Sequence, residues 1–336
     1  MIISRTPLRI SFAGGGSDFK EFYAEHGGAV LSVAIRKFVY LSLHPMFHRE
    51  KIFLKYSESE LVDSVSAIRH RIIREIFSQY GINGVDFNSS ADVPTGTGLG
   101  GSSAFTVGLI NLCNAYTNQI IYRRDIAEEA CHVEIDRLGS PIGKQDQYAA
   151  TFGGMNYFRF RPDGHVEVQP IFLDGVTRAR LQSRLRMYYL GESRSANSVL
   201  VEQQKNLAAN SQVIANVKRM VNLAEELRGA VSHGNVDAVG QILHDGWMYK
   251  KEMARTICNE RIDHYYNLGL ANGAVGGKLL GAGQGGFLLF YSPESEHERL
   301  RRALSELDEC EVEFDDAGTT IIYDDRSHMP ELAKVA

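Results

Sequence analysis

The chain has 336 residues, of which 44% are hydrophobic and 23% are charged, a composition that is ordinary for soluble globular proteins and excludes disordered, fibrous and collagen-like chains. Thirty-six Lys and Arg against 41 Asp and Glu leave a net charge of −5, so no basic surface field is expected to attract nucleic acid or a membrane. The length is about twice that of a common domain of ~150 residues and predicts two domains.

Cysteine spacing and the N-terminus bear on the compartment. The four cysteines lie far apart without a CxxC pair, which is typical of neither a disulfide framework nor a zinc ribbon; they are Cys113, Cys131, Cys258 and Cys310. Arg5 and Arg9 interrupt the N-terminal segment, and no apolar stretch reaches the ~18 residues of a membrane span. We therefore expect a soluble, cytoplasmic protein without membrane or nucleic-acid partners.

The first part of the chain is predicted to consist of strands and helices separated by turns. Alternating or β-branched runs predict strands at residues 7–12, 29–43 and 85–88. Apolar residues at helical spacing predict a helix over 64–80, which Gly81 closes, and a second helix over 102–116.

A further helix is expected over residues 126–138 because both of its ends carry signals. Asp125 is placed to cap the first amides, Glu128 completes the spacing of a capping box, and Gly139 suits the position after the last turn. After this helix, Pro162-Asp163-Gly164 predicts the turn of a hairpin.

The second half of the chain is predicted to be mostly helical and then mixed. Helices are expected over 195–228, 236–254, 260–271 and 294–307, and strands over 287–291, near 312 and over 320–323. The fold class is therefore α+β, with a strand-rich domain at residues 1–180 and a more helical domain at residues 181–336.

A glycine-rich run at residues 94–104 is the strongest local signal for a ligand. Its four glycines let backbone amides turn toward one point, and the helix that follows directs a partial positive charge to that point. Such a loop is expected to bind a nucleotide phosphate, although a plain turn before a core helix has the same letters. A P-loop is excluded because Ser102 stands where its lysine should be, and a dinucleotide fold is disfavoured because no acid lies between Ser102 and Arg124.

The second glycine run, at residues 281–286, matches GxGxxG but precedes a strand. A close crossing of two backbones and a contact with ligand explain it equally well.

Two carboxylates are candidates for chemistry. Asp146 lies in a short segment punctuated by Gly and Pro, where its side chain can face a cleft, although a helix cap is an alternative role. Glu134 lies on the preceding helix and is either an ordinary exposed glutamate or, with Ser102, a ligand of Mg²⁺, which needs only one or two protein oxygens beside phosphate and water. Near the N-terminus, Arg9 is placed to orient Asp146, and Asp18 to bind sugar hydroxyls.

Three sequence blocks, at residues 9–18, 94–104 and 281–286, resemble in order and distance the three motifs of the GHMP kinases, and the resemblance covers nearly the whole chain. It implies a two-domain fold, with an N-terminal domain like domain 2 of ribosomal protein S5 and a ferredoxin-like C-terminal domain. It also implies that ATP, with Mg²⁺, donates its γ-phosphoryl group to a small molecule.

The resemblance carries roles to individual residues. Asp146 matches the catalytic aspartate and Arg9 the arginine beside it, while Glu134 and Ser102 match the metal ligands; the doubled glycine before Ser102 leaves Ser103 as an alternative. The residues implied in ATP binding are Pro94, Gly96, Gly98, Leu99, Gly100, Gly101, Ser102 and Ser103. Those implied in acceptor binding are Gly15, Gly16, Ser17, Asp18, Lys144, Gln145, Arg194, Lys278, Gly281 and Gly283.

Within the family, the spellings TPLRISFAGGGSD, PTGTGLGGSSAF, GSPIGKQDQYAATFGG and KLLGAGQGGFLLF look most like D-glycero-D-manno-heptose 7-phosphate kinases. This implies transfer to the anomeric hydroxyl, which gives the 1,7-bisphosphate on the route to GDP-heptose and surface glycans. Fucokinase and galactokinase are related alternatives, and an NAD-dependent oxidoreductase or an RNA-binding S5-like protein are alternatives of another class. A 7-phosphate needs a second cation, for which Lys144, Arg194 and Lys278 are candidates and Arg194 is the preferred one.

Overall fold

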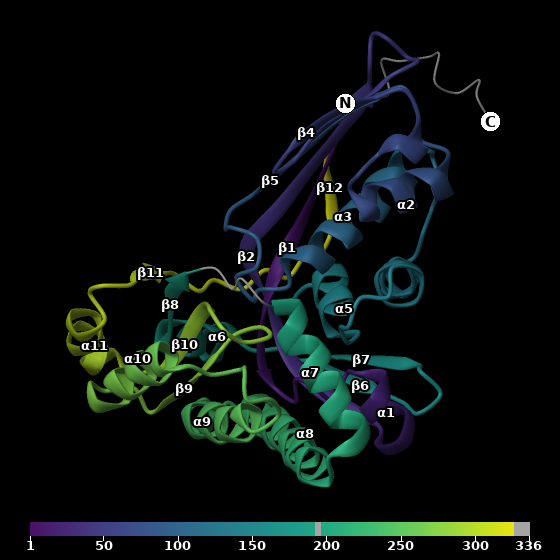
Figure 1. Ribbon diagram of the computed structural model, residues 1–336. Helices are drawn as coiled ribbons and strands as arrows, with labels where there is room; N and C mark the ends of the chain where they lie inside the picture. The colour runs from purple at the N-terminus through teal and green to yellow at the C-terminus, as the bar shows by residue number, and fades with distance from the viewer. Residues whose placement is uncertain (192–195, 326–336) are drawn as a thin grey trace.

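The computed structural model describes residues 1–191 and 196–325. In this part of the chain the strands form two sheets covered by helices (Figure 1), which confirms the predicted α+β class. The helical segments are Lys20–His26 (α1), Val65–Ala67 (η1), Arg71–Tyr80 (α2), Gly101–Tyr116 (α3), Arg123–Cys131 (α4), His132–Arg137 (η2), Gln145–Phe152 (α5), Gly175–Arg184 (α6), Ala196–Ala209 (α7), Ser211–Ser232 (α8), Ala238–Lys251 (α9), Glu260–Ala271 (α10), Glu294–Glu296 (η3) and His297–Ala303 (α11). Within those two ranges, no helix is both long and apolar enough to cross a membrane.

The larger sheet has the strand order β12-β1-β2-β5-β3-β4, and β6 pairs with β2 and with β7. Its strands are Ile2–Ala13 (β1), Gly28–Pro45 (β2), Ile52–Lys55 (β3), Ser59–Val62 (β4), Val85–Ala91 (β5), Met155–Phe160 (β6), Val166–Pro170 (β7) and Thr320–Asp324 (β12). The long strands β1 and β2 run from the end that carries the N-terminus into the centre of the molecule (Figure 1), and α3 packs against both. Leu8, Ile10 and Phe12 are buried core residues. Because side chains alternate along a strand, Arg9 and Ser11 project from the other face.

The smaller sheet is antiparallel, with the order β11-β8-β10-β9. Its strands are Leu185–Gly191 (β8), Gly276–Leu279 (β9), Gly286–Tyr291 (β10) and Asp308–Cys310 (β11). Helix α9 lies very close to β9, since a Cβ placed on Gly276 would be 1.9 Å from the carbonyl oxygen of Gly240. The approach of two backbones at these glycines therefore fixes the position of α9.

The last strand returns to the beginning of the chain. β12 pairs antiparallel with β1, and Phe314 bridges to Ile35 on β2. The predicted division at residue 180 falls within α6, between the last consecutive strand of the larger sheet and the first strand of the smaller one. It remains a prediction, and the topology adds that residues from both sides of it build the larger sheet.

The predicted helix over 126–138 differs from the structure in a way that matters for the site. α4 begins at Arg123, after Tyr122, so Asp125 lies inside the first turn and does not cap it. From His132 to Arg137 the chain forms a π-helical turn, η2, before Gly139 ends it at a left-handed φ of 65°. Apolar spacing does not reveal such a turn, because it changes the hydrogen-bond partner without changing which residues are apolar.

Other predicted helices are shorter or divided. The helix over 64–80 is a 3₁₀ turn, η1, followed by α2 from Arg71, and the helix over 294–307 is η3 followed by α11. The expected helix from 195 to 228 is two helices, because the side chain of Asn210 accepts hydrogen bonds from the amides of Gln212 and Val213 and so starts α8. Helices α1 and α5 were not predicted because they have only 7 and 8 residues, and α6 was not predicted because Leu181 is the one buried residue among its ten, which leaves no apolar period.

The contact between α9 and β9 yields a stability test. Gly276→Ala is expected to lower the free energy of unfolding by about 3 kcal/mol, because the added methyl group meets a backbone carbonyl that cannot rotate away. Gly229→Ala on the exposed side of α8 is the control: nothing lies within 4 Å of its Cβ position, and it should stabilise by about 0.5 kcal/mol or more through helix propensity. Urea unfolding measures both, and equal effects of the two substitutions would contradict the described packing.

Candidate active site

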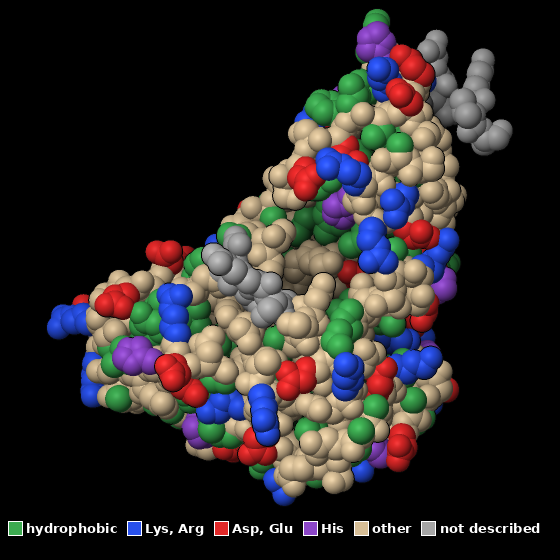
Figure 2. All heavy atoms as spheres, viewed as in Figure 1, with side chains coloured by type: hydrophobic (Ala, Val, Ile, Leu, Met, Phe, Trp, Pro, Cys, Tyr) green, Lys and Arg blue, Asp and Glu red, His purple; other side chains and the backbone are tan. Residues whose placement is uncertain are grey.

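A cavity of about 350 Å³ lies where the two sheets and their helices meet, and it is lined from both halves of the chain. Figure 2 shows the surface hollowed where the elongated upper part of the molecule joins the lower part. The structure brings most of the sequence-predicted site residues to this cavity: Arg9, Gly15, Gly16, Asp18, Gly96, Gly98, Gly100, Gly101, Ser102, Ser103, Glu134, Gln145, Asp146, Gly281 and Gly283.

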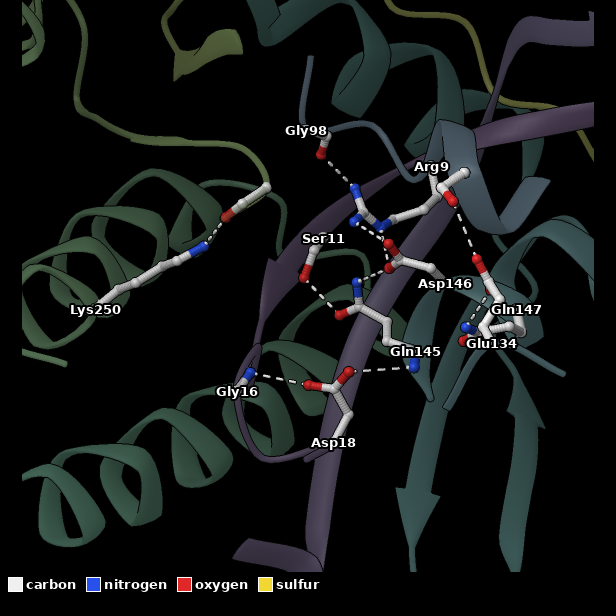
Figure 3. Close-up of polar contacts among 12 residues, drawn as sticks. Arg9, Ser11, Gly16, Asp18, Gly98, Glu134, Gln145, Asp146, Gln147 and Lys250 are labelled. Atoms are coloured by element: carbon white, nitrogen blue, oxygen red, sulfur yellow. Dashed lines mark hydrogen bonds and ion pairs between the residues drawn. The ribbon is translucent and has the colours of Figure 1, made fainter. Parts of the chain in front are cut away.

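Arg9 and Asp146 form a two-pronged ion pair at the cavity wall (Figure 3). The Nε and Nη2 atoms of Arg9 each donate to a carboxylate oxygen of Asp146 at 2.7 Å, and Nη1 donates to the carbonyl oxygen of Gly98 at 2.6 Å. Gln145 Nε2 adds a third hydrogen bond to the carboxylate, at 3.0 Å. Asp146 lies in the first turn of α5 without capping it. The three hydrogen bonds to its carboxylate hold that group in one orientation at the cavity wall.

The two glycine runs cross each other at the cavity edge. A Cβ on Gly98 would lie 2.4 Å from the carbonyl oxygen of Leu280, and one on Gly281 would lie 2.2 Å from the Cα of Gly98. The predicted crossing of two backbones at the second run is therefore confirmed, and because Gly281 also lines the cavity, contact with a ligand stays a prediction. Helix α3 begins at Gly101, directly after the left-handed Gly100, so its free amides and positive end face the site and suit phosphate.

Glu134 is a buried carboxylate with polar neighbours but without a cationic partner in residues 1–191 and 196–325. It is 2% exposed; Ser102 Oγ donates to it at 3.1 Å and Gln147 Nε2 at 2.7 Å. Burial raises the pKa of Glu134, and the charge of Asp146 adds to this, although hydrogen bonds from Gln147, Ser103 and Ser102 oppose it. A buried carboxylate beside a hydroxyl and the glycine loop before α3 fits a magnesium ion.

The backbone that carries Glu134 departs from a regular α-helix. Glu134 lies in the π-helical turn η2, and such turns often occur at functional sites. No group of three or more His, Cys, Asp or Glu able to hold a metal exists in the described part of the chain, so a metal here would depend on Glu134, a serine and oxygens of the ligand.

Asp18 is a second buried carboxylate that lines the cavity. Its carboxylate accepts hydrogen bonds from the amides of Gly16 at 3.0 Å and Gln145 at 3.2 Å (Figure 3). Burial raises the pKa of Asp18, and the negative charge of Asp146 raises it further. Gly143 has to be glycine here, because a Cβ would lie 2.0 Å from Oδ2 of Asp18. The carboxyl therefore keeps little freedom and can serve as a fixed acceptor for substrate hydroxyls.

Three predicted site residues support the loops without lining the cavity. The hydroxyl of Ser17 bonds to the carbonyl oxygens of Gly14 and Ala29, at 2.7 and 3.0 Å. Leu99 is buried in the core, and its carbonyl accepts from the amide of Arg9 at 3.0 Å. Pro94 is exposed. These residues shape the two loops that carry the lining residues.

Two of the cations predicted for a second phosphate, Lys144 and Lys278, do not line the cavity. Lys144 turns away and donates to the carbonyl of Gly164 at 2.8 Å, in a separate groove. Lys278 is buried on β9 and donates to the carbonyl of Phe12 at 3.1 Å without lining the cavity. Both corrections come from tertiary packing, which directs a long side chain in a way that loop position does not reveal. Arg194 lies outside the described residues.

Sequence reasoning missed Lys250, which lines the cavity from α9. Its ammonium group donates to the carbonyl of Gly281. Burial lowers the pKa of Lys250 to about 8, and the charge of Arg9 acts in the same direction, while Asp18 and Asp146 oppose it. A sequence signal exists in retrospect: Lys250 follows Leu243 and Trp247 at helical spacing, and all three are buried.

Comparisons with known families find kinases. Residues 67–154 match the family described as GHMP kinases N terminal domain, and residues 220–309 match GHMP kinases C terminal. The first match contains the loop before α3, Glu134 and Asp146. The oxidoreductase and RNA-binding alternatives did not predict these matches, whereas the sequence resemblance did.

Individual relatives point the same way. The chain is 29% identical over 90% of its length to a D-glycero-alpha-D-manno-heptose 7-phosphate kinase of Campylobacter jejuni, and covers 93% of that protein. It is 27% identical to a bifunctional fucokinase/GDP-fucose pyrophosphorylase of Arabidopsis thaliana, over 91% of this chain and 31% of that one. A solved D-glycero-D-manno-heptose 1-phosphate kinase of Bacteroides thetaiotaomicron shares the fold, with a TM-score of 0.79, 24% identity and coverage of 96% and 100%.

The lowered pKa of Lys250 yields a pH-dependent stability test. Below pH 8 the lysine is protonated in the folded and unfolded protein, and its burial destabilises the fold. Between about 8 and 10.5 the unfolded chain binds more protons than the folded one, so stability rises with pH. Relative to Lys250→Met, the free energy of unfolding of the natural protein should therefore rise by about 3 kcal/mol across this window.

Urea unfolding from pH 7 to 10.5 measures this difference. Lys251→Met is the matched control, because Lys251 is the next residue of the same helix and pairs with Asp263 at 3.2 Å outside the cavity. A difference for Lys250→Met that does not rise with pH would show that its ammonium group is not buried as described.

Proposed function

Since the chain belongs to the GHMP kinases and is a sugar kinase, we propose that it phosphorylates the anomeric hydroxyl of D-glycero-D-manno-heptose 7-phosphate. The donor is ATP and the product is the 1,7-bisphosphate, on the route to GDP-heptose. The observation that carries the proposal is the pairing of Arg9 with Asp146 beside the glycine loop, in a cavity that also has an acceptor side at Asp18.

The relative from Campylobacter jejuni supports the choice of acceptor, because it matches over nearly the full length of both chains. Galactokinases of Thermococcus kodakarensis and Pyrococcus furiosus also match, at 27% and 25% identity. Another sugar 1-kinase activity, on fucose or galactose, is therefore the alternative. Both options share the reaction at the anomeric hydroxyl and differ in what the acceptor side of the cavity has to hold.

The residues of this chain divide the chemistry as follows. Asp146 accepts the proton of the anomeric hydroxyl. At the same time the anomeric oxygen bonds to the γ-phosphorus, and the bond between the γ-phosphorus and the leaving ADP breaks. Arg9 keeps the Asp146 carboxylate pointed at that hydroxyl, and Asp18 orients the sugar ring by accepting hydrogen bonds from its other hydroxyls. The amides at the start of α3 stabilise negative charge on the phosphates, and such positioning and charge stabilisation supply most of the catalysis in phosphoryl transfer.

Glu134 and Ser102, with Ser103 as the alternative hydroxyl, would hold Mg²⁺. The burial of Glu134 without a cationic partner in the described part of the chain supports this assignment. When bound, the ion neutralises charge on the transferring phosphates.

A first test removes the proton acceptor. Asp146→Asn is expected to reduce kcat/KM by about 10² to 10⁴, because the amide cannot take the proton and pairs poorly with Arg9. Coupled measurement of ADP release with heptose 7-phosphate checks this. Asp63→Asn, whose side chain is 86% exposed, is the control and should keep natural activity. Near-natural turnover by a folded Asp146→Asn protein would refute the role of Asp146.

A second test concerns the metal. Glu134→Gln is expected to raise the Mg²⁺ concentration needed for half-maximal activity by about tenfold or more, because a carboxylate ligand is lost. Glu129→Gln, on α4 but bound to Tyr80 outside the cavity, serves as the control. Titrating Mg²⁺ against Ser102→Ala and Ser103→Ala then identifies the hydroxyl ligand. An unchanged Mg²⁺ requirement in Glu134→Gln would remove Glu134 from the metal site.

A further inference from the structure

Lys250 is a cation that the proposed chemistry does not use. It is 9% exposed and lines the cavity opposite Arg9 and Asp146 (Figure 3). Its ammonium group has three N–H donors, and the contact to the carbonyl of Gly281 accounts for one of them. It forms no ion pair with a carboxylate in the described ranges 1–191 and 196–325. An ammonium group left buried without a counter-ion destabilises a fold, so its presence in a cavity points to an anionic ligand.

The location of Lys250 is fixed by two close contacts. Gly276 brings the backbone of α9 against β9, and a Cβ on Gly16 would lie 2.6 Å from Cε of Met253, just after α9. Helix α9 is therefore held between the smaller sheet and the N-terminal glycine turn. Lys250 extends from this helix to Gly281 and so lies between the turn that carries Asp18 and the second glycine run.

The charges around Asp146 divide the cavity into two sides. Glu134 and Lys250 lie on opposite sides of Asp146 (Figure 3). The charge of Asp146 acts on both, while Arg9 and Asp18 also act on Lys250. Glu134, Ser102 and the start of α3 belong to the donor side, where the nucleotide phosphates are expected. Lys250 and Asp18 belong to the acceptor side.

We propose that Lys250 binds the phosphate group of a sugar-phosphate acceptor and thereby selects phosphorylated over free sugars. The inference depends on the proposed function, which requires such an acceptor. Sugar hydroxyls alone do not need a buried cation, since Asp18 and neutral groups can hold them. Lys278 on β9 does not share this role, because burial and the charges of Lys250 and Arg9 lower its pKa, and its amino group donates to the carbonyl of Phe12.

The test compares two acceptors in the full chain with saturating ATP and Mg²⁺. Lys250→Met is expected to raise KM for D-glycero-D-manno-heptose 7-phosphate by about 100-fold, while kcat/KM for the unphosphorylated heptose changes by less than about 3-fold. Lys250→Arg keeps a positive charge and should restore most of the affinity for the phosphate. Lys251→Met, on the same helix but paired with Asp263, should match the natural protein.

Each outcome separates the possible roles. An equal loss of kcat/KM with both acceptors would mean that Lys250 serves the transferred phosphoryl group or the fold, and would overturn the proposal. Unchanged kcat/KM with both acceptors would also overturn it. If the natural protein itself does not prefer heptose 7-phosphate over heptose, the proposed acceptor is wrong and the role of Lys250 falls with it. A natural preference that persists in Lys250→Met would refute the role of Lys250 alone. Protection against thermal unfolding by each acceptor provides a second readout that does not require turnover.

Discussion

The guanidinium group of Arg9 joins the parts of the site that have to act together. Its Nε and Nη2 atoms hold the Asp146 carboxylate, and its Nη1 atom holds the Gly98 carbonyl in the glycine loop. The carboxylate and the loop therefore keep one spacing, set by the planar guanidinium group. Strand alternation decides that Arg9 projects into the cavity, and the pairing of β1 with β2 keeps the strand in place. Displacing β1 would thus displace both halves of the site.

Several charges in the cavity are held at a cost to stability. Glu134, Asp18 and Lys250 are all buried, and burial raises the pKa of the two acids and lowers that of the lysine. Both shifts favour the neutral form. Hydrogen bonds from amides and side chains compensate this cost in part, but only ligands with opposite charge compensate it fully. The proposed Mg²⁺ beside Glu134 and the proposed phosphate beside Lys250 would be such ligands. The arrangement is what a kinase needs, since it assembles strongly charged substrates away from water.

Local patterns predicted the long, regular elements well. The apolar run of β10 and the helix α10 agree with the structure to within one residue at each end, and β1 contains the whole predicted strand but begins five residues earlier, at Ile2. Predictions differ where tertiary contacts or backbone hydrogen bonds decide the outcome. The π-helical turn that carries Glu134 leaves no mark on apolar spacing, and the break at Asn210 depends on one side chain that caps the next helix. Lys144 and Lys278 had suitable positions in the chain, but packing directs both away from the cavity.

The amino-acid sequence by itself determined the identity of the loops, because glycine at 98, 100 and 281 permits positive φ angles that side chains rarely adopt and, at 98 and 281, a backbone approach that leaves no room for a Cβ. The sequence also determined which chemical groups the motifs carry, namely an arginine, two acids and serines at the motif spacing. Only the tertiary structure decided which charges meet, since Lys250 is more than a hundred residues away from every carboxylate it faces. Electrostatic interactions depend on distance in space and on burial, and neither quantity is written in the order of residues along the chain.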